Sequence, residues 1–456
     1  MRKIIHLLLL IGCVSSVQSQ TPEITSWIRN LTGITGSHYV NGNSTAIADA
    51  DSANVQTVLY SANWVYVRTK GVPSYTTGPF LDGNPSLTTS QNAIFKISRV
   101  PVQNTGTLTA TTGGNIGIFV NGVALFDYRD GVAWNTNTNA LCGGPGNPPC
   151  PGGPGATMNW NRDAVVAERI GFDCSKGHPA MGNYHHHQNP SAFKLDLNVV
   201  STICSLYDAD GLYSIDSTQH SPLIGYAYDG FPIYGAYAYQ NTNGTGPVVR
   251  MKSSYQLRNI TVRTTSPTGA IVPAGPPVST TYPLGYFRED YEYIPTSAST
   301  PDYLDEHNGR FCITPEYPQG TYAYFATVDA LWNSAYPYVV GPTFYGTVTG
   351  SKVTTITETV TVYNGTTGIS ENANQVPVNV MYSSQGDFIA IQYYGLLSTP
   401  LQIDLFDLQG KVAGKTTIQP GSTIGYLDAS GLYDGQYIVR TTGDSFSRSQ
   451  KVMVVR

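Results

Sequence analysis

The stretch NIGIFVNGVALFDYRD, residues 115–130, contains two apolar runs that meet at Asn121-Gly122. Asn-Gly between two such runs predicts a β-hairpin, because glycine readily adopts the positive φ that a tight turn requires. Similar runs of β-branched and aromatic residues, bounded by Gly, Asn or Pro, occur at 55–69 and 92–102. These patterns predict a mostly β protein.

The composition favours an exported protein. Charged residues make up only 12% of the 456 residues, about half the usual share. Tyr, Thr, Asn, Ser and Gly take their place, which suits strands and turns. The formal net charge is −5, and no basic stripe indicates a nucleic-acid partner. Residues 163–174 predict one short helix, with Asp163 as its N-cap.

Residues 1–19 predict a signal peptide. Arg2 and Lys3 precede a short apolar run, and residues 17–19 offer small side chains for cleavage. A lipoprotein signal is the alternative, because the LIGC sequence that ends at Cys13 resembles a lipobox, with the lipid on that cysteine. No other segment is long and apolar enough to predict a transmembrane helix.

Five cysteines remain after this leader, and disulfides are expected in an oxidising compartment. Cys142 and Cys150 bracket a loop rich in Gly and Pro, whereas Cys174 and Cys204 flank a run of histidines. Each of these pairs is a candidate disulfide, with Cys312 left over, but spacing alone does not decide the connectivity. A thiolate metal ligand at Cys174 or Cys312 is the alternative.

The chain divides by composition after residue 345. We expect a large, β-sandwich-like N-terminal domain over residues 21–346. Residues 347–376 alternate Thr with Val or Ile and predict a Thr-rich linker with one or two strands. Short alternating strands over 377–456 predict a small C-terminal β-sandwich.

The C-terminal unit carries the runs DLFDLQGKV (404–412) and LDASGLYDGQYIV (427–439), and it ends on KVMVVR (451–456). In order, spacing and position, these runs resemble the type A C-terminal sorting domain of the type IX secretion system of Bacteroidota. The resemblance implies that this secretion machinery is a partner and that the protein is secreted or attached to the outer cell surface. An accessory β-sandwich without a sorting role is the alternative.

Four motifs of the N-terminal region are also familiar. They are GHPAMGNYHHH (177–187), HSPLIGYAYDGFPIYG (220–235), LDEHNGR (304–310) and TPEYPQGTYAYF (314–325). Together they resemble the YHYH domain family of exported proteins over roughly residues 50–346. The resemblance implies no particular reaction, so the chemistry must be argued from the residues.

The histidine run departs from the family at His186, where the family has its second Tyr. If residues 183–188 form a strand, His185 and His187 share one face, whereas Tyr184 and His186 share the other. Two histidines separated by one residue on a strand can chelate one metal ion.

A third ligand must come from another part of the chain. The leading candidates are His178, His220 and His307, and the chain also offers the carboxylates of Asp229, Asp305 and Glu306. Ligation rich in imidazole favours copper or zinc over calcium. Side chains predicted to lie behind the ligands as hydrogen-bond partners are Tyr184, His186 and Asp229. In the alternative interpretation, the histidines bond to the backbone or to tyrosine hydroxyls and hold no ion.

Two acidic segments have structural alternatives. Asp229-Gly230 lies between apolar arms and predicts a type I′ hairpin turn. Asp208, Asp210 and Asp216 depart from the EF-hand pattern, which favours a plain turn over a calcium loop.

A third cluster gathers acid, imidazole and guanidinium groups within residues 304–316. Such groups are typical of a general acid–base set or of a salt-bridged surface loop. The members of this cluster are Asp305, Glu306, His307, Arg310 and Glu316.

The predicted function is that of a secreted or cell-surface metal-binding protein that holds copper or zinc in a histidine cluster. One alternative is a metal-dependent extracellular hydrolase or oxidase with an open coordination position. The other is a tyrosine-rich adhesin or glycan-binding protein in which the histidines are structural. The sequence contains no motif for a nucleophile elbow, a HExxH zinc site or a phosphate loop, so it does not decide whether the protein is an enzyme.

Overall fold

A computed structural model describes residues 20–456, apart from 84–85, 145, 154–157, 193–202, 208, 210, 297–298, 365–377, 384–386, 394–396, 398, 408–410, 421 and 444–446. The described residues divide into two units, one within residues 1–365 and the other within residues 366–456. The predicted signal peptide lies outside the described residues, and so do Cys13, Asp208 and Asp210.

The hairpin predicted around Asn121-Gly122 is confirmed. It joins β6 (Asn115–Phe119) to β7 (Ala124–Phe126), which pair in antiparallel fashion. The amide of Gly122 donates to the Phe119 carbonyl over 2.8 Å. Gly122 has a φ of +84°, a conformation that glycine adopts without steric cost.

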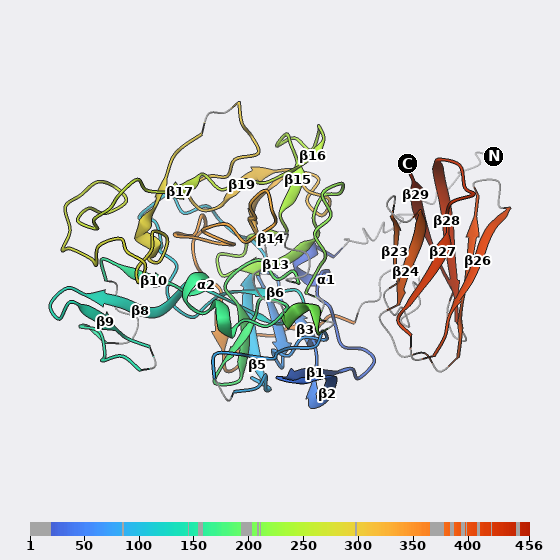
Figure 1. The fold of residues 1–456 in the computed structure, drawn as a ribbon, viewed down its shortest axis with the longest axis horizontal. Coiled ribbons are helices and arrows are strands. Elements are labelled where there is room, and N and C mark those ends of the chain that lie inside the picture. The colour runs from blue at the N-terminus through green and yellow to red at the C-terminus, as the bar shows by residue number, and fades with distance from the viewer. Residues whose placement is uncertain are drawn as a thin grey trace, which may run out of the picture. The chain divides into compact units, whose positions relative to one another are not determined.

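This hairpin lies in the middle of an eight-stranded sheet, the largest sheet of the first unit (Figure 1). β12 pairs with β7, and β14 with β20, in parallel; the other neighbours are antiparallel. In sheet order the strands are β11 (His178–Ala180), β12 (Asn183–His186), β7, β6, β13 (Leu223–Ala227), β14 (Pro232–Tyr234), β20 (Thr321–Phe325) and β19 (Gly309–Cys312).

A five-stranded antiparallel sheet shares its core with the eight-stranded sheet. Its strands are, in order, β21 (Ser351–Val353), β5 (Ala93–Ser98), β4 (Trp64–Thr69), β3 (Val55–Tyr60) and β22 (Thr361–Val362). Val58 and Phe95 of this sheet belong to the same buried cluster as Ile118 and Tyr226 of the larger sheet. Burial of these apolar side chains is the main stabilising contribution to the first unit.

Shorter elements surround these two sheets. The small sheets are formed by β1 (Thr35–Val40) with β2 (Asn43–Ser52); by β10 (Asn161–Asp163), β8 (Arg129–Asn135) and β9 (Ala140–Cys142); by β15 (Tyr237–Tyr239) with β16 (Val248–Arg250); and by β17 (Tyr255–Leu257) with β18 (Tyr291–Tyr293). Among the described residues, the helical turns are α1 (Pro22–Thr25), α2 (Ala164–Ala167), η1 (Arg169–Gly171), η3 (Ile203–Ser205) and η4 (Arg288–Asp290).

The helix predicted after Asp163 is present as α2, followed directly by η1. The carboxylate of Asp163 accepts a hydrogen bond from the Val165 amide over 2.8 Å, as expected of an N-cap. This capped turn matters for the site described below because it ends at Glu168.

The segment predicted as a linker contributes two strands. β21 and β22 pair with β5 and β3, so both add to the five-stranded sheet of the first unit. The rest of that segment, from residue 365 onward, lies outside the described residues. The exact domain boundaries remain predictions.

The second unit is formed from a three-stranded and a four-stranded sheet around one buried cluster. Its strands are β23 (Val378–Ser383), β24 (Phe388–Tyr393) and β27 (Ile424–Asp428), then β26 (Val412–Ile418), β25 (Leu401–Phe406), β28 (Gly435–Thr442) and β29 (Ser447–Val454). Both units are therefore mostly β, as predicted.

The turn at Asp229-Gly230 joins β13 and β14, so the hairpin is confirmed, but the predicted type I′ turn is wrong. A type I′ turn needs positive φ at both central residues, and only Gly230 has it, at +91°. The amide of Gly230 donates to the Ala227 carbonyl over 2.9 Å. Gly230 is therefore the last residue of the turn that begins at Ala227, and it forms the β-bulge that often accompanies a three-residue hairpin loop.

Both candidate disulfides are formed, Cys142–Cys150 and Cys174–Cys204. Cys312 is buried and free. Cys174 is therefore not a thiolate ligand, because its sulfur is bonded to Cys204.

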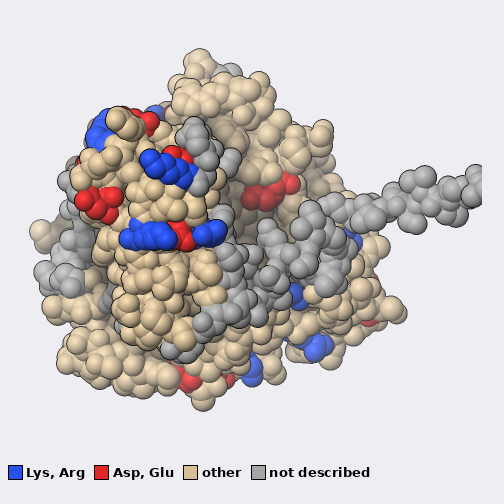
Figure 2. Space-filling view, turned by 90° about the vertical axis from the view of Figure 1, so that its right-hand side faces the viewer, with Lys and Arg blue, Asp and Glu red and all other residues tan. Residues whose placement is uncertain are grey.

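Charged side chains are sparse on one face of the surface (Figure 2). On the face drawn in Figure 2, Lys, Arg, Asp and Glu are sparse and of mixed sign, in keeping with the low content of charged residues. In the described part of the chain, no helix has the length and apolar character needed to cross a membrane.

Gly122→Ala is expected to lower the free energy of unfolding of the first unit by about 2–5 kcal/mol. A Cβ at this position would lie 2.3 Å from Thr69 Oγ1, and overpacking costs roughly 1–3 kcal/mol in addition to roughly 1–2 kcal/mol for the left-handed φ. Urea unfolding followed by tryptophan fluorescence measures this change, because all five tryptophans lie in the first unit.

Gly42→Ala is the matched control. Gly42 has a similar φ of +81° but no atom within 4 Å of the added Cβ, so only the conformational cost of about 1–2 kcal/mol applies. Equal losses in the two variants would contradict the close approach at Gly122.

Candidate metal centre

The β11–β12 hairpin places one histidine opposite another. His178 pairs with His185, and Ala180 pairs with Asn183 beside the turn. Met181 and Gly182 form the turn, with φ values of +50° and +83°. The two imidazoles therefore face each other across neighbouring strands, although they are seven residues apart in the chain.

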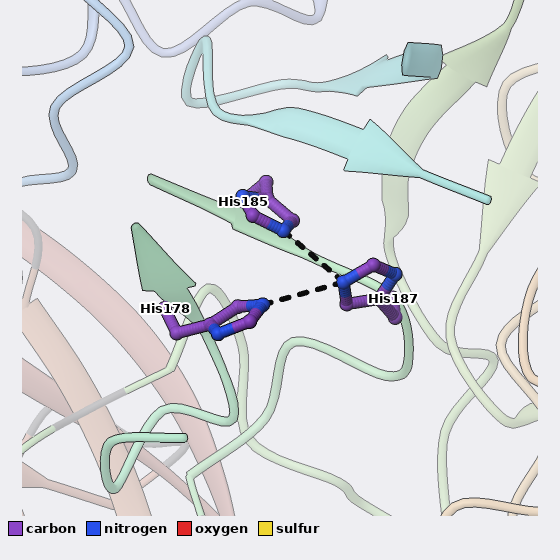
Figure 3. Close-up of side chains that lie close together, drawn as sticks. All are labelled: His178, His185 and His187. Carbon is purple, nitrogen blue, oxygen red and sulfur yellow. Dashed lines mark hydrogen bonds between the residues drawn. The ribbon is translucent and has the colours of Figure 1, made fainter. Parts of the chain in front are cut away.

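His187 completes a cluster of three imidazoles, shown in Figure 3. Its Nε2 atom lies 3.1 Å from His185 Nε2 and 3.3 Å from His178 Nε2. One ligand nitrogen from each ring lies within 4.8 Å of the others. All three residues are buried, with exposed fractions of 7% for His178, 2% for His185 and 4% for His187.

Backbone carbonyls fix the orientation of two of these rings. His185 Nδ1 donates to the Asn183 carbonyl over 2.8 Å, and His187 Nδ1 donates to the Asp127 carbonyl over 2.6 Å. Because a carbonyl only accepts, Nδ1 carries the hydrogen in each ring. The Nε2 atom of each neutral ring then presents a lone pair to the centre of the cluster.

Aromatic side chains hold the rings in place. Phe126 stacks on His185 with ring centroids 3.8 Å apart, and it meets His187 edge-on. Phe172 packs edge-on against His178, with centroids 4.9 Å apart. Phe126 ends β7, so the 115–130 hairpin supplies both this ring and the Asp127 carbonyl.

One carboxylate lies beside the cluster. Glu168 Oε2 is 3.3 Å from His178 Nε2 and 3.4 Å from His187 Nε2. This oxygen is buried and has no hydrogen-bond partner among the described residues, although the side chain as a whole is 27% exposed. Sequence reasoning missed Glu168; the available signal was an acid within the segment predicted to form a helix, ten residues before His178.

The surroundings shift the pKa values in opposite directions. Burial lowers the pKa of His178 from 6.5 to about 4, and burial also lowers the pKa of His185 well below its usual value. For His187, burial works in the same direction, but the nearby negative charge of Glu168 outweighs it and raises the pKa. Burial by itself would raise the pKa of Glu168, but the neighbouring imidazoles of His187 and His178 outweigh it and lower that pKa.

Tyr184 and His186 point to the other face of β12, as strand alternation predicts. The Tyr184 hydroxyl donates to Asp173 Oδ2 over 2.8 Å. His186 Nδ1 donates to the Lys176 carbonyl over 3.0 Å, and His186 Nε2 accepts from the Tyr75 hydroxyl over 2.8 Å. These hydrogen bonds support the strand from behind and do not reach the three imidazoles.

The structure does not bring His220 or His307 to the cluster. His220 Nδ1 donates to the Ser221 carbonyl over 2.8 Å, and the His220 ring contacts Tyr234 and Tyr239. His307 Nδ1 lies 2.8 Å from Thr343 Oγ1. The reason is strand order: His307 precedes β19, which ends the eight-stranded sheet at the edge opposite β11.

Asp229 also bonds away from the imidazoles. Its Oδ2 atom accepts from the Tyr324 hydroxyl over 2.5 Å and from the Gly346 amide over 2.9 Å. Asp216, the described member of the acidic loop, accepts from the Thr218 amide over 2.8 Å, as in a plain turn.

The cluster at 304–316 is not assembled as an acid–base set. Glu306 Oε1 lies 3.6 Å from His307 Nε2. Arg310, however, donates to backbone carbonyls, including that of Gln240 over 3.0 Å. Asp305 accepts from the Tyr322 hydroxyl, and Glu316 from the Tyr234 hydroxyl, each over 2.8 Å. These hydrogen bonds stabilise loops.

Comparison with known proteins identifies the first unit. The family model described as YHYH protein matches residues 94–337, more than half of the chain. This chain belongs to the YHYH protein family. The match contains Glu168 and all three clustered histidines. A second model, the secretion system C-terminal sorting domain, matches residues 385–455, whereas no curated protein matches the chain.

Both predicted resemblances are therefore confirmed. The protein is a YHYH protein with a type IX sorting domain, which directs it to secretion or to attachment at the outer surface. Its buried cluster of three histidines has the composition of a metal site.

Proposed function

We propose that this YHYH protein binds one zinc or copper ion through His178, His185 and His187. The observation that carries the proposal is the convergence of three buried Nε2 atoms. Two of the separations between them, 3.1 and 3.3 Å, are close to the roughly 3.3 Å expected between nitrogens that are each about 2.0–2.1 Å from one tetrahedral ion.

Hydrogen bonding alone accounts poorly for this arrangement. The Nδ1 hydrogens of His185 and His187 are already donated to carbonyls. Neutral rings then present only lone pairs to one another, and a buried acceptor without a donor is costly. A shared proton or a cation relieves this repulsion, and a cation satisfies all three nitrogens at once.

The donor set favours a particular class of ion. Imidazole nitrogen suits zinc and copper, whereas calcium and magnesium prefer oxygen ligands. Zinc and copper sites are often oriented by hydrogen bonds from the second ring nitrogen to a carbonyl or a carboxylate, and His185 and His187 both have such bonds. Because the sorting domain directs the protein to secretion or to the outer surface, the ion would be held outside the cell.

Two alternative functions gain no support from the described residues. The described tyrosines of the first unit are buried or partly exposed, and hydroxyls such as those of Tyr184, Tyr234 and Tyr324 donate to carboxylates within the fold. An open pocket of about 320 Å³ is lined by Arg129, Asn161 and the Cys142–Cys150 loop, and by none of the three histidines. A substrate in that pocket would not meet the ion.

Elemental analysis of protein purified without a histidine tag tests the proposal. We expect about one equivalent of zinc or copper per chain, and we expect His185→Ala and His187→Ala each to weaken binding by more than about 100-fold. His220→Ala is the matched control, because His220 is a largely buried histidine outside the cluster and should keep the full metal content.

A wild-type protein that takes up neither ion after dialysis against zinc or copper salts would contradict the proposal. So would an ion that both His185→Ala and His187→Ala retain with wild-type affinity.

The pH dependence of metal binding should show competition by about one proton. Bound rings must be neutral, and the lowered pKa values of His178 and His185 keep these rings neutral as the pH falls below 6.5. The raised pKa of His187 leaves this ring as the main site where protons compete. As the pH falls from about 6.5 to about 5, affinity should therefore fall by about tenfold per pH unit.

Competition titrations against a chelator of known affinity, repeated across this range, measure that slope. A thousandfold loss per pH unit, the value for three histidines that protonate independently, would contradict the burial argument.

A further inference from the structure

Glu168 lies against the three histidines but belongs to a different part of the chain, the turn that follows α2. We propose that Glu168 Oε2 is the fourth ligand of the ion, so that three imidazoles and one carboxylate close the coordination shell. This inference rests on the metal binding proposed above and adds the residue that completes the site and selects the ion.

Four of the six distances between the proposed ligand atoms match the edges of a tetrahedron. These four are 3.1, 3.3, 3.3 and 3.4 Å, and they join His187 Nε2 to its three neighbours and His178 Nε2 to Glu168 Oε2. Four ligands that are each about 2.0–2.1 Å from a central ion are separated by roughly 3.3–3.4 Å. Glu168 Oε2 is therefore as far from the two nitrogens as a fourth ligand would be.

The chemistry of the carboxylate points the same way. Glu168 Oε2 is buried and has no hydrogen-bond partner among the described residues, and an ionised carboxylate only accepts. Facing it are the Nε2 atoms of His178 and His187. A cation between these atoms gives every one of them a partner, whereas a single proton serves only one contact at a time.

Local packing holds Glu168 in this place. Asp163 caps the preceding turn through the Val165 amide. After Glu168, the backbone at Gly171 approaches Asp82 so closely that a Cβ would lie 2.6 Å from Asp82 Oδ2. The capped turn before Glu168 and the tight contact after it limit how far its backbone can shift.

A closed shell of this kind narrows the identity of the ion. Tetrahedral ligation by three nitrogens and one oxygen suits zinc, whereas copper(II) prefers tetragonal geometry. Four protein ligands also leave no open position for a substrate, which favours binding over catalysis. The side chain of Glu168 is 27% exposed, compared with 9% for His178 and 3% for His187, so it is the ligand through which the ion would enter and leave.

Glu168→Gln in the full chain tests the inference, because it keeps the size of the side chain but replaces the carboxylate by a weak ligand. Zinc affinity, measured by chelator competition, should fall by about 10–100-fold, and zinc release to excess chelator should accelerate. Cobalt(II) in the wild-type site should give the strong visible absorption of tetrahedral cobalt, and this absorption should change in Glu168→Gln.

Asp82→Asn is the matched control, because it removes a negative charge but keeps the size of the side chain beside Gly171. The charge of Asp82 also acts on His178, but Asp82 is not part of the cluster of ligand atoms. If Glu168 acted only through its charge, the two variants would weaken zinc binding to a similar extent. Ligation predicts a large loss and a changed cobalt spectrum in Glu168→Gln alone.

The outcomes separate this inference from the proposed function. Wild-type zinc affinity and an unchanged cobalt spectrum in Glu168→Gln would overturn the proposal that Glu168 is the fourth ligand. If His185→Ala still lost zinc, the proposed three-histidine site would stand. Failure of the wild-type protein to bind any zinc or cobalt would overturn both. Tryptophan fluorescence of each variant verifies that the first unit is folded.

Discussion

The hydrogen bond from His187 Nδ1 to the Asp127 carbonyl, 2.6 Å long, links the central hairpin of the fold to the histidine cluster. It fixes the side of the ring that carries the hydrogen and turns the Nε2 lone pair inward. It forms because β12 pairs in parallel with β7, with His185 beside Ala124. This pairing places His187, which follows β12, next to Asp127, which follows β7. The geometry of the cluster therefore depends on the register between β12 and β7.

Burial and electrostatics act against each other in this cluster. Removing an imidazole from water disfavours its charged form, so the pKa values of His178 and His185 are low. Glu168 is the opposing influence, because its negative charge stabilises a proton on His187. The same negative charge, beside three imidazole nitrogens that present lone pairs, also stabilises a metal cation. A site of this kind is prepared for a cation before the cation arrives, which lowers the reorganisation required on binding.

Covalent and aromatic support surrounds the cluster. The Cys174–Cys204 disulfide belongs to a buried group that includes Phe172, and Phe172 packs on His178. The compartment to which the sorting domain directs the protein is one where disulfides persist. On the other face of β12, His186 bonds to Tyr75 and to the Lys176 carbonyl, so the histidine that departs from the family pattern supports the strand.

Several features were predictable from sequence because they depend on local periodicity or on neighbours in the chain. Asn121-Gly122 predicts its hairpin, Asp163 predicts its helix, and strand alternation puts His185 and His187 on one face. The sorting domain was recognisable because its motifs are continuous in the chain. None of these predictions required knowledge of how remote segments pack.

Tertiary structure alone decided which remote groups join His185 and His187. From the sequence, His178, His220 and His307 were equivalent candidates, and Glu168 was not a candidate. Strand order separates them, because His178 pairs directly with His185 whereas His307 precedes the strand at the opposite edge of the sheet. The turn after α2 adds Glu168 from a third element. Metal ligation requires atoms within a few ångströms of one another, and spacing along the chain does not determine that distance when the groups lie on different elements.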